Sequence, residues 1–235
     1  MKCLIIIPAY NEAANIEKVI NNIVQNYPQY DYVIINDGST DKTAKVCANA
    51  GYQVLNLPIN MGIGGAVQTG YRYAKKNNYD AAVQIDGDGQ HDVAFLEDML
   101  KLLESGEADV VIGSRFVQKE GFQSSQIRRV GIRFLSILAR ILTGVQIRDI
   151  TSGYRVVNRR FIEIYANDYP ADYPEPEAMI IAAVYGGSIK EYPVIMRERE
   201  NGTSSITFKK SVYYMIKVTL AMLVRRLSFG FRREK

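Results

Sequence analysis

The chain has little cysteine and no long apolar run, and each shortage excludes a class of protein. Its 235 residues include only two cysteines, Cys3 and Cys47, with no Cys-x-x-Cys pair. A fold held by a disulfide framework is therefore excluded, and a reducing compartment is expected. No run of 18 uninterrupted apolar residues occurs, so no membrane-spanning helix is predicted. The apolar start at residues 1–8 is too short for a signal peptide, and none is expected.

The composition that remains is that of a globular protein with an uneven charge. Hydrophobic residues make up 47% of the chain and charged residues 23%, which is enough to bury one core. The net charge is +4, yet residues 209–235 carry eight Lys or Arg and one Glu, so the rest is net acidic. We therefore predict one domain over 1–207 and a basic amphipathic helix and tail over 208–235.

Apolar runs alternate with helical patterns through the first half of the chain. Strands are predicted at 2–7, 32–35, 53–57, 81–85 and 109–112, and helices at 12–25, 41–50, 63–76 and 93–103. Repeated βα units predict an α/β fold with a mostly parallel sheet and helices on both faces. After residue 112 the alternation stops. There the patterns are a helix at 128–142, a polar loop at 149–155, an acidic Pro-rich segment at 169–177 leading into a helix, and a strand at 189–196.

Asp86 and Asp88 follow the fourth predicted strand, two residues apart and separated by glycine. Carboxylates at this spacing can share one Mg²⁺ or Mn²⁺, which prefers one or two protein carboxylates plus substrate phosphate oxygens. In isolation such a pair is more often an acidic turn. However, polar loops at 8–12 and 36–41 follow the first two strands and lie at the same edge, where α/β sheets bind ligands. Three converging loops favour metal-assisted chemistry on a diphosphate.

Two other features of this half have alternative interpretations. The glycine cluster at 60–65 follows the third strand, whereas a dinucleotide fingerprint follows the first. A tight turn that opens a packed helix is expected there instead. His91, the sole histidine, either completes a metal site or orients its loop by hydrogen bonding. The second interpretation is favoured because Mg²⁺ prefers oxygen ligands.

The order of these motifs resembles family 2 glycosyltransferases. The residues concerned are Pro8-Ala9-Tyr10-Asn11-Glu12, Asn36-Asp37-Gly38-Ser39-Thr40-Asp41 and Asp86-Gly87-Asp88-Gly89-Gln90-His91. Later segments at 113–115, 149–155 and 199–205 are similar to the polyprenyl-phosphate sugar synthases, the dolichol-phosphate-mannose-synthase-like branch. The resemblance covers about residues 2 to 206. It implies the GT-A fold, a nucleotide-binding α/β sandwich, and an inverting hexosyl- or N-acetylhexosaminyltransferase.

The resemblance also implies roles for individual residues. The nucleoside would be held by Pro8, Tyr10, Glu12, Asp37 and Asp86. The metal, Mg²⁺ or Mn²⁺, and the donor diphosphate would be held by Asp86, Asp88 and Gln90. The phosphates of donor and acceptor would be held by Arg115, Arg129, Arg133, Arg199 and Ser204. Asp86, Asp88, Arg115 and Arg199 would form the catalytic group, while Asp41 is expected to cap a helix.

The acceptor decides the mechanism. A sugar hydroxyl needs a general base, for which Glu175 and Glu177 are the candidates. A lipid phosphate is already mostly dianionic at neutral pH and needs none, in which case these glutamates position the acceptor loop or cap the following helix. The arginine-rich second half favours the lipid phosphate. The predicted reaction moves a sugar, from a UDP-sugar rather than a GDP-sugar donor, to a polyprenyl phosphate. The alternative acceptor is a hydroxyl of a cell-surface glycan.

Two apolar, basic stretches at 130–145 and 211–229 bear on location. Neither is long and clean enough to span a bilayer, but basic amphipathic helices can lie in the membrane interface. The alternative is packing against the sheet. A peripheral protein on the cytoplasmic face of the cell membrane is expected, with a small integral membrane protein or a second copy as further partners. Nucleic acid is not expected, because the positive charge is confined to one apolar tail. A non-catalytic nucleotide-sugar-binding protein is disfavoured because the acidic motif and the arginines are intact.

Overall fold

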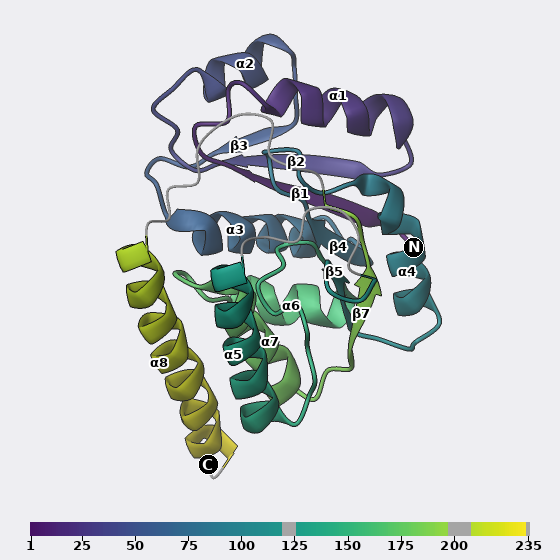
Figure 1. Ribbon diagram of the computed structural model, residues 1–235. Helices are drawn as coiled ribbons and strands as arrows, with labels where there is room; N and C mark the ends of the chain where they lie inside the picture. The colour runs from purple at the N-terminus through teal and green to yellow at the C-terminus, as the bar shows by residue number, and fades with distance from the viewer. Residues whose placement is uncertain (119–125, 197–207, 234–235) are drawn as a thin grey trace.

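Seven short strands form one sheet in the computed structural model, which describes residues 1–118, 126–196 and 208–233 (Figure 1). The strand order is β3-β2-β1-β4-β6-β5-β7. The strands are β1 (Cys3–Ala9), β2 (Asp31–Asn36), β3 (Val54–Asn56), β4 (Ala81–Gln84), β5 (Val110–Ser114), β6 (Arg155–Asn158) and β7 (Ile189–Pro193). The predicted α/β fold with a mostly parallel sheet is confirmed, and the five predicted N-terminal strands are all present.

One strand runs against the others. β6 pairs antiparallel with both β4 and β5, while all other pairs are parallel. Arg155, the first residue of β6, lies opposite Gln84, the last residue of β4. The segment that precedes β6 is therefore delivered to the same edge of the sheet as the loop that follows β4. Neither β6 nor the helix after it was predicted from the sequence.

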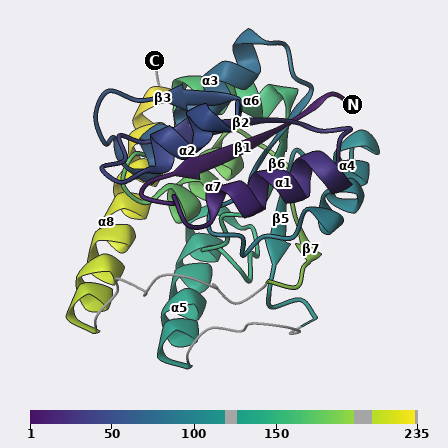
Figure 2. The same cartoon turned by 90° about the horizontal axis from the view of Figure 1, so that it is seen from above.

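Helices cover both faces of the sheet (Figures 1 and 2). One face packs against α1 (Ile16–Asn26), α2 (Thr43–Asn49) and α4 (Leu96–Glu104), the last preceded by the short 3-10 helix η1 (Val93–Phe95). The other packs against α3 (Gly62–Lys76), α5 (Gln126–Thr143), α6 (Arg159–Asn167), α7 (Pro174–Val184) and α8 (Phe208–Arg233). β1 serves both cores, because Ile5 and Ile7 face one and Leu4 and Ile6 the other. Such strands, buried on both sides, read as continuous apolar runs.

The C-terminal helix α8 lies beside α5 and packs on α7 (Figures 1 and 2). Val218 and Met222 are buried in the core. Arg225 forms an ion pair of 2.9 Å with Asp168, and Arg226 Nε donates to the carbonyl of Leu142 at the end of α5. Within the described ranges, no helix combines the length and apolarity needed to cross a bilayer.

Both cysteines are buried and unoxidised. Cys3 lies on β1 and Cys47 on α2, in the same core. Burial raises the pKa of Cys3 to about 12 and also raises the pKa of Cys47.

Candidate active site

A cavity of about 440 Å³ opens at the carboxyl edge of the sheet. Its walls are the loops after β1, β2 and β4 together with the first turns of α3 and α7. It is lined by Pro8, Ala9, Tyr10, Glu12, Asp37, Asn60, Gly62, Ile63, Ala66, Asp86, Gly87, Asp88 and Glu175. The structure thus brings together all five residues predicted to hold the nucleoside and both predicted metal carboxylates.

Hydrogen bonds from Asn11 join the loop after β1 to the loop after β2. Asn11 has a positive φ of 57°, a conformation that asparagine tolerates better than most residues. Its Oδ1 accepts from the backbone N–H groups of Thr40 (2.9 Å) and Asp41 (3.2 Å), and its own N–H donates to Ser39 Oγ (3.0 Å). The next residue, Glu12, donates its N–H to Thr43 Oγ1 (2.9 Å). The two loops therefore form one unit that presents Glu12 to the cavity.

The helix after this loop begins at Ile16, four residues later than Glu12, where it was predicted to start. Glu12 Oε2 accepts from Asn15 Nδ2 (2.7 Å). The predicted cap at Asp41 is not formed, because α2 begins at Thr43 with Lys42 at its N-cap and without a side-chain cap bond; Asp41 Oδ1 instead accepts from the N–H and hydroxyl of Thr43. Burial alone would raise the pKa of Asp41, but the hydrogen bonds from Thr43 and Ala13 lower it. Asp41 is absent from the residues that line the cavity.

Asp37 fixes the start of α3. Its side chain is buried, and Oδ1 accepts from the N–H of Met61 (2.7 Å) while its carbonyl accepts from Asn60 Nδ2 (3.2 Å). Gly38 follows at φ +64°, and a Cβ there would lie 2.7 Å from the backbone nitrogen of Asn60. Only glycine fits that approach. A Cβ on Gly64 would lie 2.0 Å from the carbonyl oxygen of Pro170. The glycine cluster therefore opens a packed helix, as predicted.

Hydrogen bonds and ring stacking fix the loop that carries Asp86 and Asp88. Asp86 Oδ1 accepts from Gln84 Nε2 (3.0 Å), and the Asp86 N–H donates to His91 Nδ1 (3.1 Å). The His91 ring is buried and stacks on Tyr154 at 5.1 Å between centroids. The Tyr154 hydroxyl donates to the carbonyl of Asp92 (2.9 Å). These contacts agree with the favoured interpretation of His91 as the residue that orients this loop.

The donor set fits a hard divalent cation. Asp86 and Asp88 both line the cavity, and carboxylate oxygens are the ligands that Mg²⁺ and Mn²⁺ prefer. Within the described residues, no group of three His, Cys, Asp or Glu side chains could hold a metal by itself. A cation here would complete its shell with phosphate oxygens and water. Gln90 donates its backbone N–H to Asp88 Oδ1 (3.1 Å) and is not among the lining residues, so its role as a metal ligand stays a prediction.

The segment before β6 lies against the metal carboxylate, a contact that the sequence did not indicate. A Cβ on Gly153 would lie 3.4 Å from each carboxylate oxygen of Asp86 and 3.0 Å from Gln84 Nε2. Ser152 Oγ donates to the carbonyl of Gly113 (2.6 Å). Together with Tyr154, whose hydroxyl donates to the carbonyl of Asp92, this backbone supports the aspartate loop.

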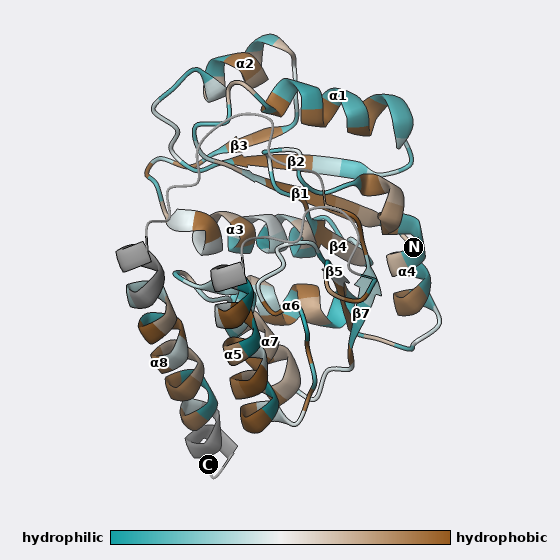
Figure 3. Cartoon of the chain, viewed as in Figure 1, coloured by the Kyte–Doolittle hydropathy of each residue, from teal (hydrophilic) through white to brown (hydrophobic). Residues whose placement is uncertain are grey.

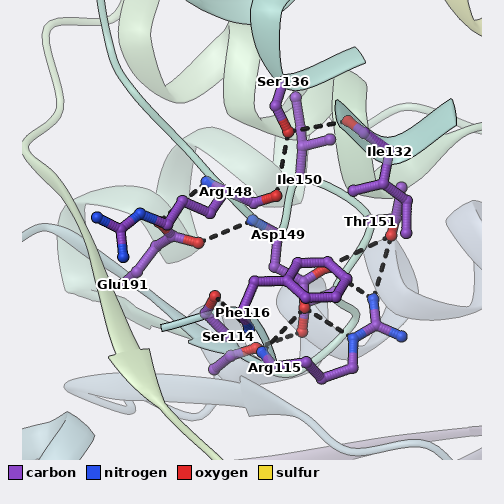
Figure 4. Close-up of polar contacts among 12 residues, drawn as sticks. Ser114, Arg115, Phe116, Ile132, Ser136, Arg148, Asp149, Ile150, Thr151 and Glu191 are labelled. Carbon is purple, nitrogen blue, oxygen red and sulfur yellow. Dashed lines mark hydrogen bonds and ion pairs between the residues drawn. The ribbon is translucent and has the colours of Figure 1, made fainter. Parts of the chain in front are cut away.

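Arg115 holds the same segment through a buried ion pair (Figure 4). Its Nε and Nη2 donate to Oδ2 and Oδ1 of Asp149, both at 2.7 Å, and Nη2 also contacts Thr151 Oγ1 (3.2 Å). Asp149 is fully buried, and its N–H donates to Glu191 on β7 (2.8 Å). Arg115 is not among the residues that line the cavity. Its predicted contact with a phosphate stays a prediction, whereas its support of the 149–155 segment is a structural fact.

Two other predicted phosphate ligands lie away from the cavity, and two are not described. Arg129 and Arg133 are exposed on α5 and do not line the cavity, so the structure does not bring them to the aspartates. Arg199 and Ser204 lie outside the described residues. The structure also separates the two candidate bases. Glu175 lines the cavity, while Glu177 lies 3.9 Å from Arg225 on α8.

Comparisons with known proteins agree with this geometry. The sequence model described as glycosyl transferase family 2 matches residues 4–165. Polyprenol monophosphomannose synthase of Mycolicibacterium smegmatis is 29% identical over 227 residues, which cover 92% of this chain and 85% of that protein. UDP-N-acetylglucosamine–dolichyl-phosphate N-acetylglucosaminyltransferase of Methanococcus voltae is 30% identical over 210 residues, which cover 81% of this chain and 83% of that protein.

A solved structure has the same fold. Glucosyl-3-phosphoglycerate synthase from Mycobacterium tuberculosis, in complex with Mn²⁺, UDP-glucose and phosphoglyceric acid, superposes with a TM-score of 0.75. The alignment covers 96% of this chain and 79% of that chain at 20% sequence identity. The three proteins compared here are named for three different sugars, so the similarity specifies a kind of reaction rather than one sugar.

Proposed function

Since the chain belongs to glycosyltransferase family 2, we propose that it moves a sugar from a nucleotide-sugar donor, with a UDP-sugar favoured, to a polyprenyl phosphate. One observation carries the proposal. A single cavity at the carboxyl edge holds acidic side chains suited to a nucleoside, Glu12 and Asp37, beside the pair suited to a metal, Asp86 and Asp88. The lipid acceptors in the names of two relatives and the UDP-glucose in the solved structure support it.

The donor half of the cavity has groups for each part of a nucleoside diphosphate. Carboxylates that only accept hydrogen bonds, such as Glu12 and Asp37, suit base N–H and ribose hydroxyl donors. Asp86 and Asp88 would hold Mg²⁺ or Mn²⁺, which as a Lewis acid neutralises charge on a leaving diphosphate. Gln84 and His91 hold Asp86 in place, so the carboxylate needs little rearrangement when the donor binds.

A phosphate acceptor would need no general base from this chain. Its second pKa lies near 6, so it is mostly dianionic at neutral pH and attacks without a base. Attack in line with the departing diphosphate gives inversion. The predicted acceptor contacts of Arg199 and Ser204 remain part of this proposal.

The membrane surface is proposed from two exposed apolar stripes on α5 and α8 (Figure 3). On α5 the stripe is Val130, Phe134, Ile137 and Ile141. On α8 it is Tyr213, Ile216, Leu220, Val224 and Leu227. At about 100° per residue each set falls on one side of its helix, opposite the buried residues. Both helices are therefore apolar on two opposite faces, one packed on the domain and one exposed.

Basic residues flank these stripes. Arg129, Arg133 and Arg140 follow one another along a single flank of α5 at helical spacing, and all three are exposed. Lys217 and Arg226 are exposed on α8. Apolar stripes with basic flanks match the interface of an anionic bilayer. We place this surface on the cytoplasmic face of the cell membrane, with a small integral membrane protein as a further partner.

Flotation with anionic liposomes tests the membrane surface. Ile137→Glu and Leu220→Glu should each reduce the liposome-bound fraction about tenfold, since a charge replaces an apolar contact with the bilayer interface. Val24→Glu is the matched control, because Val24 is an equally exposed aliphatic side chain on α1, on the other face of the sheet. Equal binding by all three variants would argue against this surface.

Product chemistry tests the reaction. The chain is incubated with a panel of nucleotide sugars and polyprenyl phosphate, and the product is identified by mass spectrometry. A sugar linked to a lipid phosphate is released by mild acid, whereas an ordinary glycoside resists it. A glycan hydroxyl is the second candidate acceptor, favoured by the position of Glu175 in the cavity, where it could act as a general base. An acid-stable glycoside on an added glycan, with no lipid product, would support that candidate.

A further inference from the structure

Arg155 is a buried cation without a carboxylate partner among the described residues. Its side chain is 1% exposed. Nη2 donates to the carbonyl of Ile150 (3.0 Å) and Nη1 to the carbonyl of Pro174 (3.4 Å), while Nε has no hydrogen-bond partner within the described part of the chain. A buried charge is costly unless it is paired and hydrogen-bonded. Such a group calls for an explanation beyond packing.

The two carbonyls show what Arg155 connects. Ile150 belongs to the segment that supports the aspartate loop, and Pro174 is the first residue of α7. The next residue, Glu175, lines the cavity. One guanidinium therefore fixes the start of α7 relative to β6 and sets the place from which Glu175 reaches the cavity.

The pKa of Tyr169 responds to the charges of both Arg155 and Glu175. Burial raises the pKa of Tyr169, the charge of Arg155 opposes that rise and the charge of Glu175 adds to it. Both charges thus act on one phenol. Arg155 likewise opposes the rise in the pKa of Tyr71 and of Tyr165, whose rings pack against each other and against Tyr169.

A phosphate acceptor does not account for the presence of the Glu175 carboxylate in the cavity. A phosphate nucleophile requires no base, and a carboxylate would repel it. A carboxylate does accept strong, charge-assisted hydrogen bonds from hydroxyl groups. In this cavity, the sugar of the donor is the group that carries several hydroxyls.

We propose that Glu175 accepts hydrogen bonds from hydroxyls of the transferred sugar, and that Arg155 is the positioning residue that holds Glu175 in the cavity. The pair selects the sugar, an inference that rests on the proposed sugar transfer. A site built to hydrogen-bond a hydroxyl discriminates against analogues that lack it.

Glu175→Gln is the first test, with Glu177→Gln as the matched control on the same helix. The wild-type chain is assayed with polyprenyl phosphate and UDP-glucose, UDP-N-acetylglucosamine and GDP-mannose to find the donor it uses. For that donor, Glu175→Gln should lower kcat/KM about 10- to 100-fold, the effect of losing a hydrogen bond to a charged group. The Kd for the corresponding nucleoside diphosphate, which has no sugar, should not change. Glu177→Gln should retain kcat/KM within about threefold.

Deoxy analogues of the donor make the test specific. When the hydroxyl that Glu175 binds is missing from the donor, wild type and Glu175→Gln should have the same kcat/KM. A loss that is equal for every deoxy donor, with an acidic limb missing from the pH profile, would identify Glu175 as a base and overturn the inference. So would an equal loss of nucleoside diphosphate binding, or no loss at all. Absence of any lipid-linked sugar with the wild type would instead reject the proposed function.

Arg155→Lys tests the positioning role. It keeps the charge but loses the planar fork that reaches two carbonyls. The expected result is the same selective loss, largest for the complete donor and absent for the deoxy donor that equalises Glu175→Gln, with unchanged nucleoside diphosphate binding. Arg155→Lys with wild-type selectivity would show that Arg155 serves stability alone and would overturn its part of the inference.

Discussion

The two sides of the cavity are held together by different forces. On the donor side, the loops after β1 and β2 are joined by hydrogen bonds from backbone N–H groups to the side chains of Asn11, Thr43 and Asp41. On the opposite side, the 149–155 segment and the start of α7 depend on buried cations, Arg115 paired with Asp149 and Arg155 bonded to carbonyls. Neutral hydrogen bonds contribute about 1 kcal/mol each, whereas a buried charge left alone costs several times more. Substitutions on the donor side should therefore lower activity, whereas substitutions on the opposite side should first lower stability.

The largest effect is expected on activity from the donor side. Asp88→Asn should reduce turnover by about three orders of magnitude, because a carboxylate that would hold the metal is lost. Thermal unfolding should stay near the wild-type value, since an asparagine keeps the size of the side chain and its Oδ1 can still accept the hydrogen bond from the Gln90 N–H. Product formation and circular dichroism measure the two quantities, with Glu97→Gln on α4 as an exposed acidic control. Full activity in Asp88→Asn would show that the metal assignment is wrong.

On the opposite side, a substitution should first lower the free energy of unfolding. Arg115→Met should cost about 3–5 kcal/mol in the free energy of unfolding, because it leaves the carboxylate of Asp149 buried and unpaired. Combining it with Asp149→Leu should recover much of the loss, since an apolar pair of similar size can replace a buried ion pair. Urea denaturation of the single and double variants measures this. A single variant as stable as the wild type would remove the contrast between the two sides.

Gly64 lies where the two sides meet. Gly64→Ala should cost about 3 kcal/mol, because its Cβ would lie 2.0 Å from the carbonyl oxygen of Pro170. The control is Gly51→Ala, where a Cβ has no atom within 4 Å but φ is +67°, so about 1 kcal/mol is expected from backbone strain alone. Denaturant midpoints compare the two. Equal losses would mean that the α3 start can move away from residues 170–171.

The smallest effect is expected from pH at Glu177. Burial raises its pKa, and Arg225 only partly opposes the rise. A carboxyl group with a raised pKa in the folded state adds stability at low pH, and that contribution is lost as the pH rises through the folded-state pKa. Glu177→Gln should therefore be as stable as the wild type at pH 7, or more stable by about 1 kcal/mol or less, and relatively less stable near pH 4. The opposite trend in melting temperature would indicate that Arg225 outweighs burial.

The sequence predicted the donor side well because its loops follow parallel strands. Each of these strands is an apolar run, and the polar residues after it point to the edge where ligands bind. Pro8, Tyr10, Glu12, Asp37, Asp86 and Asp88 accordingly all line the cavity. The position of each loop follows from the strand before it, whereas the roles of the individual residues came from the resemblance to family 2 glycosyltransferases.

The other side was not predictable in this way. β6 is only four residues long and is reversed, so its functional segment comes before the strand instead of after it. The partners are also far apart in the sequence: 34 residues separate Arg115 from Asp149, and 62 separate Tyr154 from Asp92. The family resemblance suggested that Arg129 and Arg133 hold phosphates, but helix α5 leaves both exposed and outside the cavity. A residue's type does not reveal which face of a long helix it occupies relative to a distant loop.

The two buried cysteines give the chain a practical property. Thiolate is the form that alkylating dyes attack, and burial raises the pKa of both thiols while the core shields them. The native chain should therefore react very little with maleimide reagents. A single cysteine introduced at an exposed position of α5 or α8 would be the dominant labelling site, without prior removal of Cys3 or Cys47. A polarity-sensitive fluorophore there would record, in real time, whether that helix enters a hydrocarbon environment.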